Sequence, residues 1–372
     1  MTDAGRYSVV VRSTIKRDTI GGTIMPKTMR AAVLRELKTP LKIEAVAMPE
    51  PRPGEVLIKV AACGVCHSDV HAVDGDWDPL PGLPLIPGHE VTGHVAARGA
   101  HVHGLKDGDV VGVPWMWSAC GACEHCLAGN ETICAGGEST GYSKPGGYAE
   151  YITAPAAYVG RLPAKADLVG LAPVLCAGVT VYRGLKRTMA RPGQCVAVFG
   201  IGGLGHLAVQ YAKAMGLQVA AVDIADDKLR LATALGADMV VNAKKGDPVR
   251  ALKKELAGGP HAAVVTTPAG IAFDQAIRSL RPSGTCSFIG VPGRDGDRLP
   301  ISIGKVINGE LSLRGSNVGS RLDLAEAIRF AVEGQVKVKV ERQPLRAINK
   351  VLERMRRGKI VGRVVLDIAA EG

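Results

Sequence analysis

Long apolar stretches and aromatic residues are both scarce in this sequence. Phe, Trp and Tyr make up 4% of its 372 residues, and no uninterrupted apolar run approaches membrane length. A transmembrane helix needs ~20 consecutive apolar residues, so we expect no membrane partner. Solenoid repeats and low-complexity segments are missing as well, which favours a globular enzyme over a fibrous or disordered chain.

The N-terminus lacks the features of a secretory signal. Residues 1–28 contain Asp3 and Asp18 and no continuous apolar region, whereas a signal peptide has an apolar core of about 7–15 residues. We therefore predict a disordered tail over residues 1–28 and a cytoplasmic location. The mildly basic composition of this stretch leaves a weak transit peptide as the alternative.

Basic residues outnumber acidic ones, but they form no nucleic-acid-binding pattern. The formal net charge is +11, and the basic side chains are scattered apart from a cluster over residues 350–359. A nucleic-acid surface would show a basic stripe interleaved with aromatic residues, and the sequence has none. We predict no nucleic-acid partner and expect the positive charge to attract an anionic cofactor mildly.

The chain is longer than one hydrophobic core usually organises, so two domains are expected. Residues 30–175 hold strand-like runs between turns rich in Pro and Gly. Beyond them, short apolar strands alternate with helical patterns, with strands expected at 194–200, 218–223, 239–242, 262–267, 285–290 and 311–316. This alternation predicts a doubly wound parallel sheet. The segment after Ser316 is expected to return to the first domain.

Four of the nine cysteines form a closely spaced group with the pattern C-x2-C-x2-C-x7-C, at Cys120, Cys123, Cys126 and Cys134. Four thiolates can close a tetrahedral shell around Zn2+, which leaves no place for substrate and indicates a structural site. An iron–sulfur cluster is the alternative, but ferredoxin motifs have a three-residue third spacer followed by Pro. Here Ala135 follows the last cysteine, so zinc is favoured. His125 is expected to face outward and not to bind the metal.

A second group of metal-binding residue types is spread over three stretches of the chain. They comprise Cys66, His67, Ser68, Asp69 and His71 in the first stretch, His89 and Glu90 in the second, and Cys176 in the third. Taken singly, a buried Cys is usually a small apolar residue, so each signal is weak. Together, two thiolates and one imidazole would bind Zn2+ with a fourth position open to water or substrate.

A glycine-rich motif predicts a dinucleotide site. Gly200, Gly202 and Gly205 satisfy G-x-G-x-x-G, directly after an expected strand and at the start of an expected helix. Such a turn lets a pyrophosphate approach the positive N-terminus of the helix. Asp223 ends the next strand, about 20 residues on, where an acid binds the ribose 2′-hydroxyl. A carboxylate there would repel the 2′-phosphate of NADP, so NAD is the predicted cofactor.

The stretches GVCHSD, IPGHE, SACGACEHC, LCAGVTVY, GIGGLGHLAVQYAKAMG and GRVVLD carry a family resemblance. Over roughly residues 29–368 the sequence resembles the zinc-containing medium-chain alcohol dehydrogenases, in particular their bacterial and yeast ethanol-active branch. The resemblance implies an α/β two-domain fold and a homotetramer. A GroES-like, mainly-β catalytic domain would comprise 29–179 and 319–372, with a structural-zinc lobe at 119–135. A Rossmann NAD-binding domain would comprise 180–318.

The resemblance also implies residue roles at the catalytic zinc. Cys66, His89 and Cys176 would bind the metal, and Asp69 would orient the ring of His89. Glu90 would approach the metal during ligand exchange, or alternatively would be a charge held by a basic neighbour. Ser68 and His71 would relay the proton released from the alcohol.

Further positions would line the cofactor and the substrate. The cofactor positions implied by the resemblance are His67, Thr180, Gly200, Gly202, Gly203, Leu204, Gly205, Asp223, Lys228, Ile289, Val291, Ser316, Val318 and Arg363. Trp77 and Trp117 match bulky positions of the substrate channel, which would favour short, unbranched alcohols. Asn130, where relatives often carry Trp, and residues 78–82 depart from the family pattern, and both could alter a subunit contact or the channel entrance.

The function implied is reversible hydride transfer from a small primary alcohol to NAD+, giving an aldehyde and NADH, with two zinc ions per subunit. A cinnamyl-type aldehyde reductase using NADPH is the nearest alternative, and Asp223 argues against it. A non-catalytic relative that only binds cofactor is a second alternative, and the complete ligand set argues against it. A zinc-ribbon nucleic-acid binder would leave the dinucleotide motif unexplained.

Overall fold

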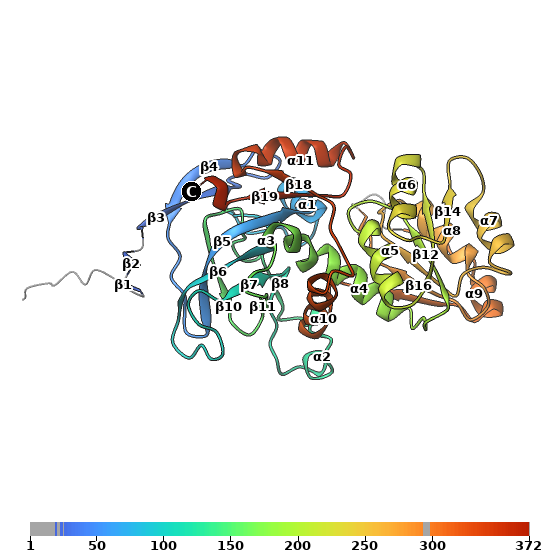
Figure 1. Ribbon diagram of the computed structural model, residues 1–372, viewed down its shortest axis with the longest axis horizontal. Helices are drawn as coiled ribbons and strands as arrows, with labels where there is room; N and C mark the ends of the chain where they lie inside the picture. The colour runs from blue at the N-terminus through green and yellow to red at the C-terminus, as the bar shows by residue number, and fades with distance from the viewer. Residues whose placement is uncertain (1–18, 21–22, 25, 293–297, 372) are drawn as a thin grey trace, which may run out of the picture.

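The computed structural model describes residues 19–20, 23–24, 26–292 and 298–371. The tail predicted over 1–28 lies mostly outside the described residues. Within it, β1 (Thr19–Ile20) and β2 (Thr23–Ile24) pair antiparallel. The rest of the chain forms a strand-rich lobe and a second lobe in which helices cover a parallel sheet, and α4 (Ala177–Arg187) lies where the lobes meet (Figure 1).

A seven-stranded sheet forms the frame of the first lobe. Its strand order is β11-β7-β6-β5-β19-β18, with β10 also paired to β5. The strands are β5 (Glu55–Val65), β6 (Glu90–Arg98), β7 (Val110–Val113), β10 (Tyr151–Pro155), β11 (Gly160–Arg161), β18 (Val340–Gln343) and β19 (Arg363–Asp367). Because β19 pairs antiparallel with β5, the C-terminal segment lies in this lobe. The apolar side chains of β5 are almost all buried, so this strand lies at the centre of the core.

Shorter elements complete the first lobe. Two further strand pairs are β3 (Thr28–Val33) with β4 (Lys42–Ala47), and β8 (Met116–Ser118) with β9 (Glu138–Ser139). The helices are α1 (His67–Asp74), α2 (Glu124–Leu127), η1 (Glu131–Ile133), α3 (Leu168–Leu171), η2 (Ala172–Leu175), α10 (Arg321–Val332), η4 (Leu345–Ala347), α11 (Ile348–Arg356) and η5 (Ala369–Glu371). Four of these helices, α1, α2, η1 and η2, carry or adjoin the candidate metal ligands.

The second lobe is the doubly wound sheet that the sequence predicts. All six strands are parallel, in the order β14-β13-β12-β15-β16-β17. The strands are β12 (Cys195–Phe199), β13 (Gln218–Asp223), β14 (Met239–Asn242), β15 (Ala262–Val265), β16 (Thr285–Phe288) and β17 (Ser312–Gly315). The helices are α5 (Gly205–Ala214), α6 (Asp226–Ala234), α7 (Pro248–Glu255), α8 (Gly270–Ser279) and α9 (Ile303–Gly309). Every residue of β12 is buried, as expected for a central strand covered on both faces.

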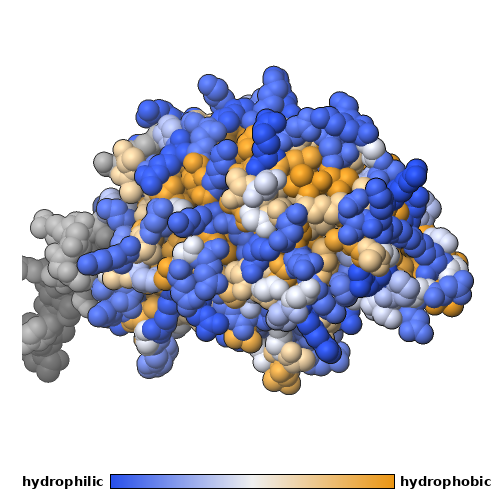
Figure 2. All heavy atoms as spheres, turned by 45° about the vertical axis from the view of Figure 1, so that its right-hand side comes forward, coloured by the Kyte–Doolittle hydropathy of each residue, from blue (hydrophilic) through white to orange (hydrophobic). Residues whose placement is uncertain are grey.

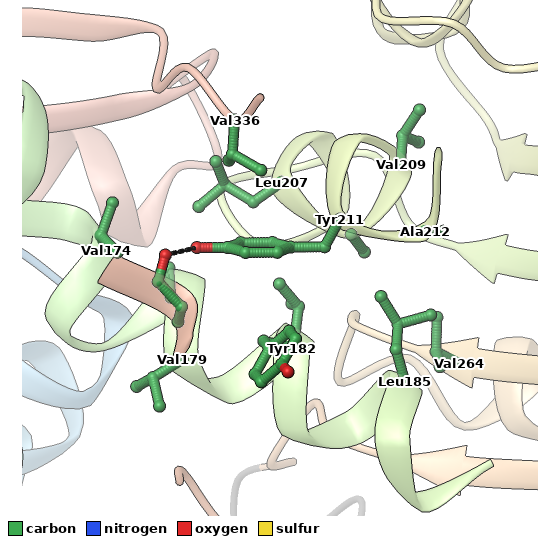
Figure 3. Close-up of a cluster of buried hydrophobic side chains, with 14 of the residues drawn as sticks. Val174, Val179, Tyr182, Leu185, Leu207, Val209, Tyr211, Ala212, Val264 and Val336 are labelled. Atoms are coloured by element: carbon green, nitrogen blue, oxygen red, sulfur yellow. Dashed lines mark hydrogen bonds between the residues drawn. The ribbon is translucent and has the colours of Figure 1, made fainter. Parts of the chain in front are cut away.

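The helices α4, α5 and α10 pack together and join the two lobes through one apolar core (Figure 3). At its centre the hydroxyl of Tyr211 on α5 donates to the carbonyl oxygen of Ala327 on α10 at 2.9 Å. The expected domain boundary at 179/180 falls inside α4. One continuous helix therefore crosses it, and the division into 29–179 with 319–372 and 180–318 stays a prediction.

The outer surface is mostly polar. Figure 2 shows one face on which hydrophilic side chains surround scattered apolar patches. In the described part of the chain, no single helix has the length and apolarity to cross a membrane, although the bent pair Leu168–Leu175 and Ala177–Arg187 meets that test by length and composition.

Candidate active site

Three buried side chains from separate parts of the chain meet near the junction of the lobes. Cys66 immediately precedes α1, His89 immediately precedes β6, and Cys176 immediately precedes α4. The two Sγ atoms are 3.9 Å apart, and the ligand atoms of these residues and Glu90 all lie within 4.8 Å of one another. Two sulfurs on a tetrahedral Zn2+ with bonds of ~2.3 Å would be about 3.8 Å apart, so the spacing suits this metal.

Asp69 sets the orientation of His89. The Nδ1–H of His89 donates to Asp69 Oδ1 at 3.1 Å. The same carboxylate accepts from the backbone N–H of Cys66 at 2.8 Å, from the Tyr148 hydroxyl at 2.8 Å and from the N–H of Gly88 at 3.2 Å. The other ring nitrogen of His89, Nε2, is buried and has no hydrogen-bond partner among the described residues. This unpaired nitrogen and the two Sγ atoms together form the donor set of a metal site.

The electrostatics of the group favour a thiolate at Cys66. A hydrogen bond from Cys176 holds the pKa of Cys66 well below its ordinary value, although burial opposes this shift. The pKa of Cys176 is correspondingly raised, because its thiol makes this hydrogen bond to Cys66 and because it is buried. A cation bound between the two sulfurs would stabilise both as thiolates.

Glu90 lies between the metal-binding group and a buried arginine. Its Oε1 accepts from the Arg363 guanidinium, and the two side chains form a buried ion pair. Burial raises the pKa of Glu90 to about 7, in spite of this partner. Gly64 makes room for the carboxylate, because a Cβ atom at that position would lie 1.9 Å from Glu90 Oε2. Glu90 therefore has the basic partner of the second interpretation and lies beside the ligands, and its approach to the metal during ligand exchange stays a prediction.

The predicted proton-relay residues lie on α1, beside the ligand Cys66. The Ser68 hydroxyl is 3.7 Å from Cys66 Sγ. His71, one turn along the helix, is buried, and its Nδ1 hydrogen-bonds to Asp76 Oδ2 at 2.7 Å. His67 is exposed at the start of the same helix, and its ring centroid is 5.0 Å from that of His71. One short helix therefore presents all three predicted residues.

An aromatic wall borders the metal-binding group, and it corrects one sequence-based assignment. Trp115 lies edge-on to His89, with ring centroids 4.8 Å apart, and Trp77 lies 6.0 Å from Trp115 and 4.9 Å from His71. Tyr142 completes the wall. Trp117, which we expected here, is instead buried in the apolar core of the first lobe. Trp115 lies in the bend before β8, and this bend directs its ring toward His89.

The four cysteines of the second metal group also converge. Their Sγ atoms lie within 4.8 Å of one another, and those of Cys120 and Cys126 are 3.9 Å apart. The N–H of Cys123 donates to Cys120 Sγ at 3.3 Å, and the N–H of Cys120 donates to Cys134 Sγ at 3.4 Å. Backbone N–H donors lower the pKa of Cys120 to about 6. The donor set fits Zn2+ without His125, which is not part of this group.

The glycine-rich turn has the geometry of a dinucleotide site. Gly200 has a φ of +91°, which favours glycine, and a Cβ on Gly205 would lie 1.8 Å from the Gly200 carbonyl oxygen. Asp223 Oδ2 accepts from the N–H of Ile201, inside this turn, at 2.6 Å. The acid at the end of β13 is therefore bonded directly to the glycine-rich turn between β12 and α5. Lys228 is half-buried in the first turns of α6.

Among the other predicted cofactor residues, the structure brings Arg363 to the same turn. The hydroxyls of Thr180 and Ser316 are buried and lack a partner in the chain as described, so they are available to a ligand. Arg363 approaches the turn closely, since a Cβ on Gly203 would lie 2.9 Å from its Nη1. Of the remaining positions, the side chain of Ile289 is buried and that of Val291 is exposed. Leu204 directly precedes α5, and the backbone of Val318 has a φ of +37°.

His206 is a candidate functional residue that the sequence analysis missed. Its Nδ1 donates to the Gly202 carbonyl oxygen at 3.0 Å, and its backbone N–H donates to the same oxygen at 3.2 Å. Burial lowers the pKa of His206 to about 4, so the ring is neutral at pH 7. The Gly202 carbonyl and the Gly203 N–H belong to one planar trans peptide and point in opposite directions. His206 therefore orients the N–H of Gly203. The G-x-G-x-x-G pattern ends at Gly205, so it gave no signal for the residue that follows.

Comparisons with known proteins match both lobes. Residues 52–164 match the family model of the alcohol dehydrogenase GroES-like domain, and residues 203–333 match that of the zinc-binding dehydrogenases. An alcohol dehydrogenase of Moraxella sp. is 53% identical over 339 residues, covering 91% of this chain and 99% of the relative. One from Geobacillus stearothermophilus is 51% identical over 340 residues, covering 91% and 100%. The crystal structure of the alcohol dehydrogenase from Aeropyrum pernix has a TM-score of 0.84 at 37% identity, covering 91% and 100%.

Proposed function

Because the chain belongs to the zinc-containing medium-chain alcohol dehydrogenases, we propose that it transfers a hydride reversibly between a small primary alcohol and NAD+. The chain is a zinc-binding alcohol dehydrogenase with alcohols and aldehydes as substrates. The choice of NAD, the small size of the alcohol and the roles of individual residues go beyond family membership. The observation that carries the proposed reaction is the convergence of Cys66, Cys176 and the unpaired Nε2 of His89, which offers a metal-binding centre for the alcohol oxygen.

Three protein ligands would leave one coordination position for the substrate oxygen. When bound, Zn2+ would lower the pKa of an alcohol hydroxyl and polarise an aldehyde carbonyl. Cys66, His89 and Cys176 would hold the ion. Asp69 fixes the tautomer of His89, because its carboxylate accepts the Nδ1 proton and leaves Nε2 as the ligand atom.

Ser68 and His71 would remove the proton that the alcohol releases. The Ser68 hydroxyl lies close to the ligand Cys66, so it is placed to accept a hydrogen bond from a substrate at the open position. His71 follows three residues later on the same helix face. Asp76 accepts the Nδ1 proton of His71, so Nε2 is the nitrogen left to exchange a proton with solvent.

The position of Asp223 supports NAD over NADP. Its carboxylate ends β13 and is hydrogen-bonded to the N–H groups of Ile201, Ile224 and Ala225. These bonds hold the carboxylate at the place where a ribose 2′-hydroxyl would donate. A 2′-phosphate would meet a fixed negative charge there.

The aromatic wall supports a short, unbranched substrate. Trp77, Trp115 and Tyr142 pack against one another with ring centroids 5.7–6.0 Å apart. Such large, mutually packed rings leave little freedom to widen the space beside His89. We therefore favour ethanol through butanol as substrates.

Assembly and location follow from the same proposal. We favour a homotetramer in the cytoplasm, with neither nucleic acid nor membrane as a partner. All nine cysteines are free thiols, and six of them make up the two ligand groups. Thiolate ligands of this kind persist in reducing compartments, which supports the cytoplasmic assignment.

Steady-state kinetics with ethanol and either NAD+ or NADP+ test the proposed function. We expect kcat/KM to favour NAD+ by at least about tenfold, because each 1.4 kcal/mol of charge repulsion is a factor of ten. The double substitution Asp223→Gly with Ile224→Arg should move the preference toward NADP+. Asp227→Asn, a matched loss of charge at an exposed position on α6, should leave it unchanged. Wild-type preference for NADP+ would instead favour the cinnamyl-type reductase.

A further inference from the structure

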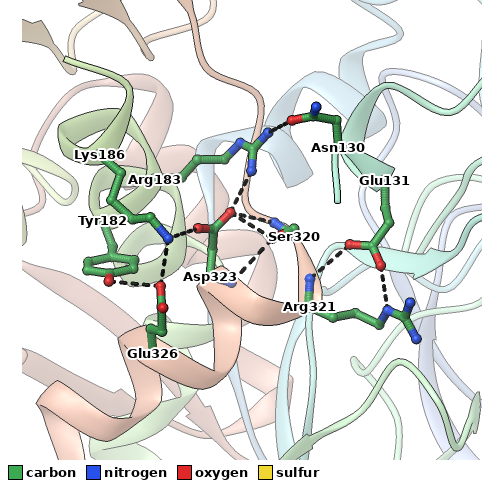
Figure 4. Close-up of polar contacts among 9 residues, drawn as sticks. All are labelled: Asn130, Glu131, Tyr182, Arg183, Lys186, Ser320, Arg321, Asp323 and Glu326. Atoms are coloured by element: carbon green, nitrogen blue, oxygen red, sulfur yellow. Dashed lines mark hydrogen bonds and ion pairs between the residues drawn. The ribbon is translucent and has the colours of Figure 1, made fainter. Parts of the chain in front are cut away.

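The turn between the last two cysteines of the structural-metal lobe makes direct contact with the segment that follows β17. Glu131, in η1, is buried, and its carboxylate accepts from Arg321 Nε at 2.6 Å and from the backbone N–H of Arg321 at 3.2 Å (Figure 4). The next carbonyl along, that of Thr132, accepts from Asn317 Nδ2 at 3.1 Å. Two successive residues of the lobe thus hold two residues of the segment 317–321.

This segment carries two of the proposed cofactor residues and a strained backbone position. Ser316 and Val318 lie on either side of Asn317, and Val318 has a φ of +37°. A β-branched side chain rarely adopts a positive φ, and such a conformation persists only where the surroundings hold it. The contacts of Asn317 and Arg321 with the lobe lie on both sides of Val318, so the lobe contributes to this constraint together with the Ser316 N–H, which donates to the Phe288 carbonyl oxygen at 3.0 Å.

A third contact reaches α4. The Oδ1 of Asn130 accepts from Arg183 Nη2 at 3.0 Å, and Arg183 Nη1 donates to Asp323 Oδ2 at 2.6 Å (Figure 4). Asp323 also accepts from Ser320, at the start of α10, and from Lys186. Asn130 therefore makes an internal contact with α4, the helix that begins directly after the ligand Cys176.

We propose that residues 130–132 are positioning residues for the cofactor, which hold the Ser316–Val318 segment in its binding conformation. The four-cysteine lobe would then set cofactor affinity in addition to local stability. This inference rests on the proposed dinucleotide-binding role of Ser316 and Val318. It differs from a purely structural role, in which loss of the contacts would lower stability and leave affinity unchanged.

Titration of the zinc-loaded full chain with NADH, followed by fluorescence, tests the proposal. We expect Glu131→Gln and Asn317→Ala each to raise the NADH dissociation constant ~3- to 30-fold. The KM for NAD+ should rise similarly with kcat within twofold of the wild type. Elemental analysis should still find two zinc ions per chain. Glu131→Asp, which keeps the charge, should restore part of the affinity, and Glu333→Gln, an exposed position after α10, should behave as wild type.

The outcomes separate this inference from the proposed function. Asn317 is exposed, so its substitution is expected to fold even where Glu131→Gln does not. If wild type binds NADH and Asn317→Ala binds it within twofold of wild type, the positioning role is overturned while the proposed function stands. If the wild-type enzyme does not bind NADH at all, both fail.

Discussion

At the scale of single residues, Asp69 connects more of the active site than any ligand does. Its two carboxylate oxygens accept hydrogen bonds from Cys66, directly before α1, from Gly88 and His89, directly before β6, and from Tyr148. The side chain of Asp69 is buried, so its contacts are with the protein and not with solvent. The resemblance implied its contact with the His89 ring, and the structure adds hydrogen bonds from the N–H groups of Cys66 and Gly88 and from the Tyr148 hydroxyl.

Asp69→Asn should lower kcat/KM about 10- to 100-fold, because an amide cannot accept from all four donors and His89 would lose its fixed tautomer. Steady-state kinetics with metal analysis on the same preparation check this. Asp74→Asn lies on the same helix and loses only an ion pair with Arg356, so it serves as the control. Wild-type activity in Asp69→Asn would contradict the orienting role.

The tryptophans show where residue-level prediction stopped. Trp115 and Trp117 are two positions apart in PWMW, and composition does not distinguish them. Only the bend before β8 decides that Trp115 faces His89 and that Trp117 enters the core. His206 was missed for a related reason, because its contact with Gly202 depends on how the turn closes.

At the scale of elements, the turn from β12 to α5 separates two uses of glycine. Gly205 packs against the Gly200 carbonyl, whereas a Cβ on Gly202 would meet no atom within 4 Å. Gly205 permits close packing of the helix on the strand, and Gly202 leaves the open space that a pyrophosphate would need.

Gly205→Ala should reduce the free energy of unfolding by ~1–3 kcal/mol, because the added methyl group overlaps backbone. Gly202→Ala should unfold like the wild type and bind NADH more weakly. Thermal unfolding and NADH titration of both variants measure the two effects. Equal unfolding temperatures for Gly205→Ala and wild type would show that the turn relaxes freely.

At the scale of the whole molecule, a buried ionic network holds α4 against α10. Burial alone would raise the pKa of Asp323, but hydrogen bonds from Lys186 and Arg183 lower it to about 2. An unfolded chain has an Asp pKa of ~3.9. Because the folded pKa is the lower one, the contribution to stability is complete above the unfolded pKa and is lost as the pH falls from about 4 to about 2.

Asp323→Asn should therefore destabilise the protein at neutral pH by on the order of 2 kcal/mol. The difference from wild type should shrink as the pH falls below 4. Urea unfolding of both proteins at pH 7, 5, 4 and 3 measures it. Asp274→Asn, which loses an exposed pair with Arg278, should show a small difference at every pH. If the loss of unfolding free energy in Asp323→Asn does not change with pH, the stabilisation does not come from the charge of Asp323.

The sequence by itself determined the features that are encoded locally. Cysteine spacing predicted a four-thiolate metal site, and alternating short strands and helices predicted the doubly wound sheet, because each depends on residues near one another in the chain. The resemblance added the second ligand set, from three distant stretches.

The tertiary structure alone decided the contacts between those units. It determined which tryptophan faces His89, that Glu90 pairs with Arg363, and that Glu131 holds Arg321. These partners lie far apart in sequence or depend on a single bend in the backbone. Periodicity and spacing in the sequence describe local conformation only. Contacts between distant residues depend on how the folded elements pack, which these patterns do not specify.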